Sequence, residues 1–188
     1  MANSSSVQQP HVDLAIVIVS YNVRDLLRDC LASLFASELD ASYAVYVVDN
    51  ASTDGSVQMV REHFPQVQLI VNRQNLGFTA GNNVALRRCR GRYVLLLNPD
   101  TRIVGDALTV MLDYIDAHGS VGVVGPQLRY GDGSLQSSRR RFPTLITGFM
   151  ESTLLQQWFP RNRWALRYYM ADTDDDRTQE VDWVNGAC

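Results

Sequence analysis

Short apolar runs recur along the first two thirds of the chain and alternate with stretches in which apolar residues follow a helical spacing. The runs are four to eight residues long and end at turn-forming residues, as strands that are buried on both faces do. The predicted strands cover residues 13–20, 43–48, 67–71, 93–97 and 121–124. This alternation indicates right-handed βαβ units and predicts an α/β fold with a mostly parallel sheet and flanking helices.

Between these strands, apolar side chains return every three or four residues, the period of a helix that packs one face on a core. In the first such stretch Leu27, Cys30 and Leu34 share that face, so Cys30 is expected in the core. Pro65 ends the second helix. The predicted helices cover residues 24–35, 57–64, 79–88 and 108–115.

The alternation fades in the last third of the chain. Gly131-Asp132-Gly133 indicates a hairpin or turn, and residues 139–141 form a basic turn. Residues 144–169 are rich in aromatic residues and leucine, residues 172–176 form an acidic, solvated loop, and residues 181–184 resume strand character. The aromatic stretch is either core or an amphipathic, membrane-contacting piece, and core is favoured.

Composition excludes several classes of protein. The 188 residues carry a net charge of −3, which gives no reason to expect a nucleic-acid partner. All 17 basic residues are arginine, and without lysine there is no Walker P-loop, Schiff-base or protein-kinase site. The three cysteines and three histidines show neither metal-ligand spacing nor a disulfide framework.

The sequence also bears on location. No apolar run reaches the roughly 18 residues of a membrane span. Residues 1–12 are expected to be a disordered lead-in, because their polar start lacks the apolar core of a signal peptide. A cytoplasmic location is therefore expected.

Polar side chains follow three of the predicted strands: Ser20-Tyr21-Asn22, Asp49-Asn50 and Asn98-Pro99-Asp100. Parallel strands bring their carboxyl ends to one edge, where α/β sheets bind ligands. Tyr21 can stack on a base, and Asp49 can accept hydrogen bonds from a base or ribose. Asp100 can hold the divalent cation that neutralises a diphosphate.

Each cluster also has a purely structural interpretation. Residues 98–100 favour a turn, Asp49 and Ser52 can cap a helix, and Asn82 and Asn83 can lie on a helix surface. Helix caps do not require three polar clusters at successive strand ends, however, so together they favour a ligand site.

Four ordered motifs carry a family resemblance. They are Ile-Val-Ile-Val-Ser-Tyr-Asn at 16–22, Val-Val-Asp-Asn-Ala-Ser-Thr-Asp-Gly-Ser at 47–56, Asn-Leu-Gly-Phe-Thr-Ala-Gly-Asn-Asn at 75–83 and Leu-Asn-Pro-Asp at 97–100. With these motifs the chain resembles the family-2 glycosyltransferases over residues 13–188. Within that family it is similar to the bacterial rhamnosyltransferase-like branch that builds cell-surface polysaccharide.

The resemblance implies a GT-A fold, with one domain over residues 13–188. A nucleotide-binding half covers about 13–125 and the start of an acceptor half about 126–188. The chain stops after a strand and a glycine turn, so it is expected to be truncated at its C-terminus. The family's general base is an acid in a Glu-Asp or similar pair after that turn, past Cys188. No catalytic residue is therefore assigned, and this segment alone is expected to bind donor without efficient turnover.

The resemblance also implies the donor-site residues. The expected nucleotide-binding residues are Ser20, Tyr21, Asn22, Asp49, Asn50, Gly77, Asn82, Asn83 and Asn98. Asp100 is the last acid of a motif that family members usually write Asp-x-Asp, and it is expected to bind Mn²⁺ or Mg²⁺. Because the first position is Asn98, one negative charge is missing and a modest metal affinity is expected.

The implied reaction is inverting transfer of a sugar, rhamnose by branch resemblance, from a nucleotide-sugar to a saccharide or lipid-linked acceptor. Arg140, Trp183 and Asn185 are the expected acceptor or sugar contacts. The basic turn has a structural alternative as a solvated turn, which is favoured, and Trp183 can equally be a core residue. Peripheral contact with the inner face of a membrane and the oligomeric state are left open.

Two other functions remain as alternatives. One is a non-catalytic nucleotide-sugar-binding or scaffold module that lacks the general base. The other, a nucleotidyltransferase, is disfavoured because Ser20-Tyr21-Asn22-Val23 has no glycine after the first strand.

Overall fold

A computed structural model describes residues 11–153, 158 and 162–184, and these residues divide into two units, 11–124 and 125–184. The predicted lead-in falls almost wholly outside the described residues. The elements of the first unit are β1 (Val12–Ser20), α1 (Arg24–Ala36), β2 (Tyr43–Asp49), α2 (Ser56–His63), β3 (Gln68–Val71), α3 (Gly77–Leu86), β4 (Gly91–Leu97) and α4 (Ala107–Ala117). Among the described helices, none is long and apolar enough to cross a bilayer.

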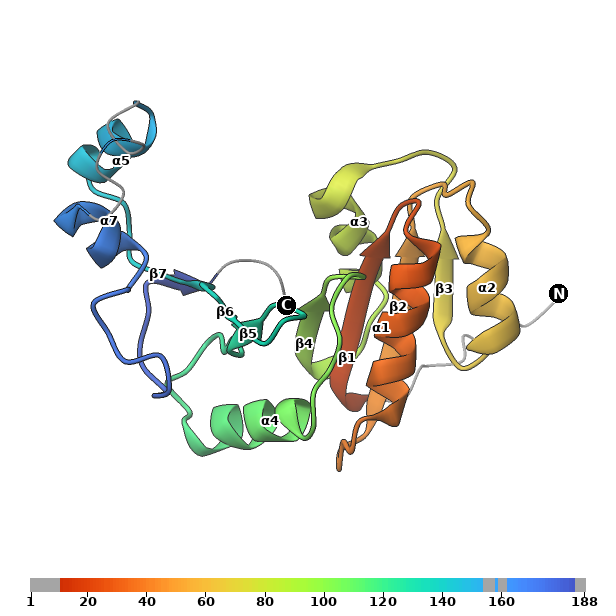
Figure 1. Cartoon of the computed structure of the whole chain (residues 1–188). Helices are drawn as coiled ribbons and strands as arrows, with labels where there is room; N and C mark the ends of the chain where they lie inside the picture. Colours follow the sequence, from red (N-terminus) through yellow and green to blue (C-terminus); the bar gives the residue numbers. More distant parts are fainter. Residues whose placement is uncertain (1–10, 154–157, 159–161, 185–188) are drawn as a thin grey trace, which may run out of the picture. The chain divides into compact units, whose positions relative to one another are not determined.

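The four strands of the first unit form a parallel sheet in the order β3-β2-β1-β4 (Figure 1). The predicted α/β fold is confirmed, because each parallel neighbour is reached through a helical crossover. Ser20 pairs with Asp49, and Ile18 pairs with Leu97. The carboxyl ends of β1, β2 and β4 therefore lie at one edge of the sheet, which we call the polar rim.

Two apolar layers sandwich the sheet. On one face Ile16, Ile18 and Val47 pack with α1, α2 and α4, and Cys30 is fully buried there as predicted. On the other face Val17, Val48 and their neighbours pack with Ala85 of α3. Strands β1 and β2 are covered on both faces, which explains their unbroken apolar sequence.

Two predictions about the first unit are wrong. Strand β4 was expected to be buried on both faces, but it is an edge strand of the described sheet. Val94 and Leu96 lie on the same face as α3, and they are exposed because α3 packs on β1 and β2 and does not cover β4. Residues 121–124 form no strand, and Val123 is 77% exposed. This four-residue run contains Gly122, which supplies no side chain to pack and weakens a strand.

The second unit consists of short elements. They are β5 (Leu128–Arg129), β6 (Leu135–Gln136), β7 (Arg139–Arg140), α5 (Leu145–Glu151), α7 (Arg163–Tyr168) and β8 (Trp183–Val184). The predicted turn at Gly131-Asp132-Gly133 joins the antiparallel strands β5 and β6. The predicted strand at the end of the chain pairs with β7.

The acidic loop of the second unit is not merely solvated. Asp172 forms an ion pair with Arg141, and Asp175 with Arg139. Opposite charges therefore tie Arg139 and Arg141 to this loop. The basic turn predicted at residues 139–141 is wrong for Arg139 and Arg140, which form strand β7.

Candidate functional site

Two buried polar atoms on the polar rim have no hydrogen-bond partner in the described structure: Ser20 Oγ and Asp49 Oδ1. Their residues are 0% and 1% exposed and are register partners on β1 and β2. The other oxygen of Asp49, Oδ2, accepts a hydrogen bond from the Ser52 N–H at 2.9 Å. A buried polar atom without a partner costs about 1–3 kcal/mol, so this pair marks the rim as a place where a ligand is expected to bind.

Tyr21 follows directly and is 49% exposed on the same rim. Its ring is free to present a face to a ligand, whereas most large apolar side chains of β1 are buried. An exposed aromatic ring beside two unpaired polar atoms suits a planar, polar ligand such as a nucleobase.

Asn22 holds two rim loops together. Its side-chain oxygen accepts a hydrogen bond from the Thr53 N–H at 2.8 Å, and its own N–H donates to Ser52 Oγ at 3.0 Å. Asn22 and Ala51 both have left-handed backbones, with φ of 52° and 65°. Such a conformation costs an alanine about 1–2 kcal/mol, and strain of this kind gathers at functional sites.

Asp54 is a rim residue that sequence reasoning treated only as a helix cap. Its carboxylate accepts from the Arg24 N–H at 2.8 Å and from the Ser56 N–H at 3.0 Å. It therefore joins the start of α1 to the start of α2. Burial alone would raise the pKa of Asp54, but bonds from the Ser56 hydroxyl and from the two N–H groups outweigh burial and lower that pKa below its ordinary value of 3.8.

We expect Asp54→Asn to lower the free energy of unfolding at neutral pH by about 1–2 kcal/mol, because it weakens two helix starts. A lowered folded-state pKa contributes stability that is present above the unfolded-state pKa and is lost as the pH falls through the folded-state value. The variant should therefore lose less stability than the parent protein between about pH 5 and pH 3. Urea unfolding across that range measures both effects.

Asp106→Asn is the control, since Asp106 is exposed and makes no side-chain cap bond. Equal slopes of unfolding free energy against pH for the parent and Asp54→Asn would contradict the prediction.

The third side of the rim is the start of α3. The buried Asn50 donates to the Gly77 carbonyl at 3.2 Å and accepts from the Asn72 side chain at 2.9 Å. Gly77 begins α3 with φ of 76°, a backbone that glycine adopts without strain. This turn lets α3 start two residues earlier than the sequence predicts.

The adjacent asparagines of α3 have different environments. Asn82 is buried and donates to the Phe78 carbonyl of its own helix at 3.1 Å, whereas Asn83 is exposed. Gly81 lets the helix approach β1, because a Cβ there would come within 2.8 Å of Val19 Cγ1. The predicted residues Gly77, Asn82 and Asn83 thus lie within about the first two turns of α3, beside the rim.

Asp100 lies in a turn after β4 that α1 holds in place. Thr101 Oγ1 donates to the Asn98 carbonyl at 2.7 Å, and the Cys30 thiol donates to the same carbonyl at 3.6 Å. Arg102 forms an ion pair with Asp29 at 2.5 Å. The turn is therefore fixed from beneath, while the Asp100 carboxylate itself is exposed and has no partner among the described residues.

The residues present fit a cation that arrives with a phosphate ligand. Among the described residues, no cluster of three or more His, Cys, Asp or Glu side chains is close enough to form a resident metal site. Mg²⁺, however, is commonly held by one or two carboxylates together with substrate phosphates. Asp100, exposed at the rim, could supply one such carboxylate.

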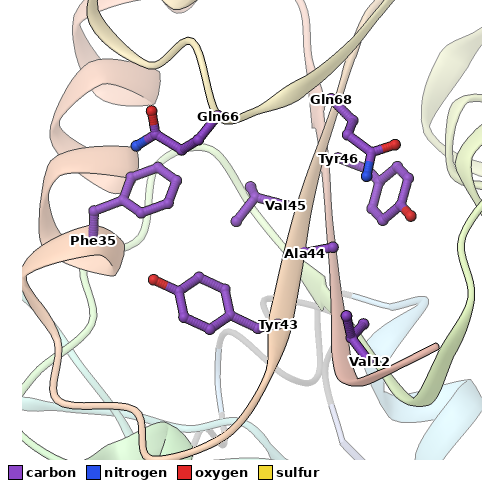
Figure 2. Close-up of a pocket in the computed structure, with 8 residues that line it drawn as sticks. All are labelled: Val12, Phe35, Tyr43, Ala44, Val45, Tyr46, Gln66 and Gln68. Atoms are coloured by element: carbon purple, nitrogen blue, oxygen red, sulfur yellow. The ribbon is translucent and has the colours of Figure 1, made fainter. Parts of the chain in front are cut away.

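A cavity of about 430 Å³ lies at the opposite edge of the sheet, near the starts of β1, β2 and β3 (Figure 2). Its lining is Val12, Phe35, Tyr43, Ala44, Val45, Tyr46, Gln66 and Gln68. Figure 2 shows Tyr43 and Tyr46 on opposite sides of β2, so the strand divides the space. Because this lining contains no carboxylate, histidine or cysteine, the polar rim is the better candidate for chemistry.

Two of the three predicted acceptor contacts are register partners in the second unit. Arg140 on β7 pairs with Trp183 on β8. The Arg140 guanidinium lies 4.6 Å from the centre of the Tyr169 ring and donates to the Ser137 carbonyl at 2.9 Å. The third, Asn185, lies outside the described residues.

Comparison with known proteins identifies the family of the chain. Residues 15–177 match the family model described as glycosyl transferase family 2. The chain is 31% identical, over 187 aligned residues, to the N-acetylglucosaminyl-diphospho-decaprenol L-rhamnosyltransferase of Mycobacterium tuberculosis, with 93% of this chain aligned. The chain spans 60% of the length of that curated relative.

Solved structures share the architecture. Staphylococcus aureus TarS 1–349, in complex with UDP-GlcNAc, is 25% identical with a TM-score of 0.51, and the match covers 63% of this chain and 38% of that one. The mannosyltransferase PcManGT from Pyrobaculum calidifontis, in complex with GDP-Man and Mn²⁺, has a TM-score of 0.54 at 23% identity, covering 64% and 36% of the two chains. These structures confirm the predicted GT-A type of α/β fold.

Proposed function

The chain belongs to glycosyl transferase family 2, and from this premise we propose that it is the donor-binding part of an inverting glycosyltransferase. The reaction would transfer a sugar from a nucleotide-sugar to a cell-surface polysaccharide or a lipid-linked acceptor. Rhamnose is the proposed sugar, because the relative with 93% of this chain aligned is an L-rhamnosyltransferase. The observation that carries the proposal is the pair of unpaired buried atoms, Ser20 Oγ and Asp49 Oδ1, beside the exposed Tyr21 ring.

The same atoms suggest which nucleotides fit. Asp49 Oδ1 accepts and the Ser20 hydroxyl can donate, so the pair complements a base edge with an N–H next to a carbonyl. Uracil, thymine and guanine have such an edge, whereas cytosine and adenine have a ring acceptor in its place. We therefore propose a uridine, thymidine or guanosine diphosphate sugar as donor, with the base stacked on Tyr21.

The remaining predicted residues have supporting roles in this proposal. Asn50 and Gly77 fix the loop that starts α3, and Asn82 and Asn83 lie five and six residues further along this helix. Asn98 and Asp100 would face the diphosphate. A divalent cation, Mn²⁺ or Mg²⁺, would be held by Asp100 and would supply charge neutralisation for the leaving nucleoside diphosphate.

Arg140 and Trp183 would contact the acceptor or the transferred sugar, as would Asn185. A planar guanidinium stacked on Tyr169 is suited to an anionic or sugar ligand. The assignment of residues 13–125 to the donor and 126–188 to the acceptor remains part of the proposal, as does a cytoplasmic location. An acceptor carried on a lipid would be met at a membrane surface.

Thermal-shift measurements against a panel of nucleoside diphosphates and their sugars test the donor site. A ligand present at 100 times its Kd stabilises the folded state by about 2.7 kcal/mol. We expect uridine, thymidine or guanosine diphosphate sugars to raise Tm, and cytidine and adenosine diphosphates to leave it unchanged. A panel in which none of the first group raises Tm would refute the proposal.

We expect Asp100→Ala to remove the effect of metal on nucleotide affinity. In the parent protein Mn²⁺ should tighten binding of the preferred nucleoside diphosphate by about tenfold or more, which is 1.4 kcal/mol. In the variant the affinities with Mn²⁺ and with EDTA should become equal, because the carboxylate that links cation and diphosphate is gone. Titration calorimetry measures both. Asp106→Ala, an exposed aspartate six residues along the chain, should keep the full metal effect; a metal effect that survives in Asp100→Ala would count against this role.

A further inference from the structure

Helix α5 and the turn before it expose large apolar side chains. Leu145 is 94% exposed, Phe142 69%, Phe149 61% and Ile146 48%. The polar Thr147 of the same helix is buried, and its N–H donates to the N-cap Thr144 hydroxyl. Soluble helices place apolar residues inward and polar residues outward. Helix α5 has the reverse arrangement, so the prediction that residues 144–169 belong to the core is wrong for Leu145, Ile146 and Phe149.

Positive charge is concentrated in the same part of the chain. Residues 139–170 contain six arginines and one acidic residue, a net charge of +5 in a chain whose net charge is −3. Arg139 and Arg141 are paired with aspartates of the acidic loop. Arg163 and Arg167 of α7 are exposed, and neither has a carboxylate partner among the described residues.

Helices α5 and α7 lie beside each other in the second unit (Figure 1). We propose that they form a surface that binds an anionic lipid bilayer. We define this α5–α7 surface by Phe142, Leu145, Ile146, Phe149, Arg163 and Arg167. Exposed apolar side chains next to arginines that have no carboxylate partner are the combination by which peripheral proteins enter the headgroup region of acidic membranes.

The charge and the apolar side chains of this surface argue against two other occupants. A second copy of the same surface would bring like charges together, which opposes self-association. Nucleic acid would leave four large apolar side chains without a partner. An acidic bilayer complements both the positive charge and the exposed apolar area of this surface. The inference rests on the proposed function in one respect: a lipid-linked acceptor would be located at a membrane.

Vesicle flotation with the whole 188-residue chain tests the proposal. We expect the chain to float with phosphatidylglycerol-containing vesicles at low salt, and to do so less with pure phosphatidylcholine or at high salt. A chain that stays unbound under all these conditions would overturn the inference.

Three variants identify the surface. Leu145→Glu combined with Phe149→Glu should weaken vesicle binding by more than about tenfold, because two apolar anchors are lost. Arg163→Gln combined with Arg167→Gln should lose the preference for phosphatidylglycerol, at roughly fivefold for each arginine. Val104→Glu is the matched control, since Val104 is 78% exposed in the first unit, and it should bind like the parent.

Two further readouts separate the possible failures. Thermal melting should be unchanged in all three variants, since the substituted side chains are exposed. Nucleotide affinity should also be unchanged, so loss of vesicle binding and failure of the donor site are independent results. If the substitutions alter sedimentation of the free chain but not vesicle binding, the surface contacts a second copy and the membrane inference is wrong.

Discussion

Asp49→Asn is expected to lower the affinity for the preferred nucleoside diphosphate by about 100-fold or more, or 2.7 kcal/mol, while leaving the fold intact. The substituted side chain keeps the volume of aspartate and one oxygen that can accept from the Ser52 N–H. It turns the unpaired Oδ1 into an NH₂ donor, which would then oppose the N–H of the base. A buried site that hydrogen-bonds its ligand strongly rejects a mismatched one. Here the NH₂ group of the variant and the N–H of the base would face each other, and both donors would lack an acceptor.

Calorimetric titration of parent and variant with uridine, thymidine, guanosine and cytidine diphosphates measures this effect. The variant should also bind cytidine diphosphate relatively better, since cytosine presents an acceptor where uracil presents an N–H. Asp13→Asn is the control: Asp13 lies at the opposite edge of the sheet, where its carboxylate accepts from the Ser42 N–H and hydroxyl. It should leave nucleotide affinity unchanged. Equal affinities of parent and Asp49→Asn would remove the main support for the donor site.

The parallel sheet could be predicted from sequence because its central strands are buried on both faces. Ala15, Val17 and Ile18 of β1 are all fully buried, so the apolar run is unbroken and its meaning is clear. The convergence of the three polar clusters followed directly, since parallel strands share their carboxyl edge. The register then brings Ser20 beside Asp49 without any further information.

Strand β4 shows the limit of that argument. Its sequence is as apolar as that of β1, but Val94 and Leu96 are exposed. An apolar run shows that a strand has apolar side chains on both faces. It does not show which helices or strands cover those faces. Burial at the edge of the described sheet is a tertiary property, and the sequence of the strand alone cannot supply it.

The loop contacts of the rim were also beyond sequence reasoning. Residues 52–55 were expected to cap the helix that follows them, and Asp54 does bond to Ser56. Its second bond, to the Arg24 N–H, spans thirty residues and depends on how two loops meet. Similarly, nothing in the sequence indicates that Ala51 adopts φ of 65° or that the Cys30 thiol lies beneath the Asn98 carbonyl. Local preferences predict a turn, but packing decides which atoms it contacts.

Gly91→Ala should have the largest effect on stability among the glycine substitutions. A Cβ at Gly91 would lie 2.7 Å from the Tyr93 carbonyl oxygen and 2.8 Å from the Ala15 nitrogen. Both are backbone atoms of the sheet, so no side-chain rotation can relieve the clash, and β4 must move away from β1. We expect a loss of about 3 kcal/mol, which lowers Tm by roughly 6–12 °C in a chain of this size.

Gly119→Ala is the matched control, because a Cβ at Gly119 meets no atom within 4 Å and the backbone there is not left-handed. It should melt with the parent. Strand β4 leads directly into the turn that presents Asp100, so Gly91→Ala should also reduce the Mn²⁺-dependent part of nucleotide affinity at temperatures where the protein is still folded. The contribution of Asp49 and Ser20 on the neighbouring strands should be retained. A variant that melts with the parent would show that β4 accommodates the extra methyl group. A full Mn²⁺ effect in a destabilised variant would show that the β1–β4 pairing does not set the position of the Asp100 turn.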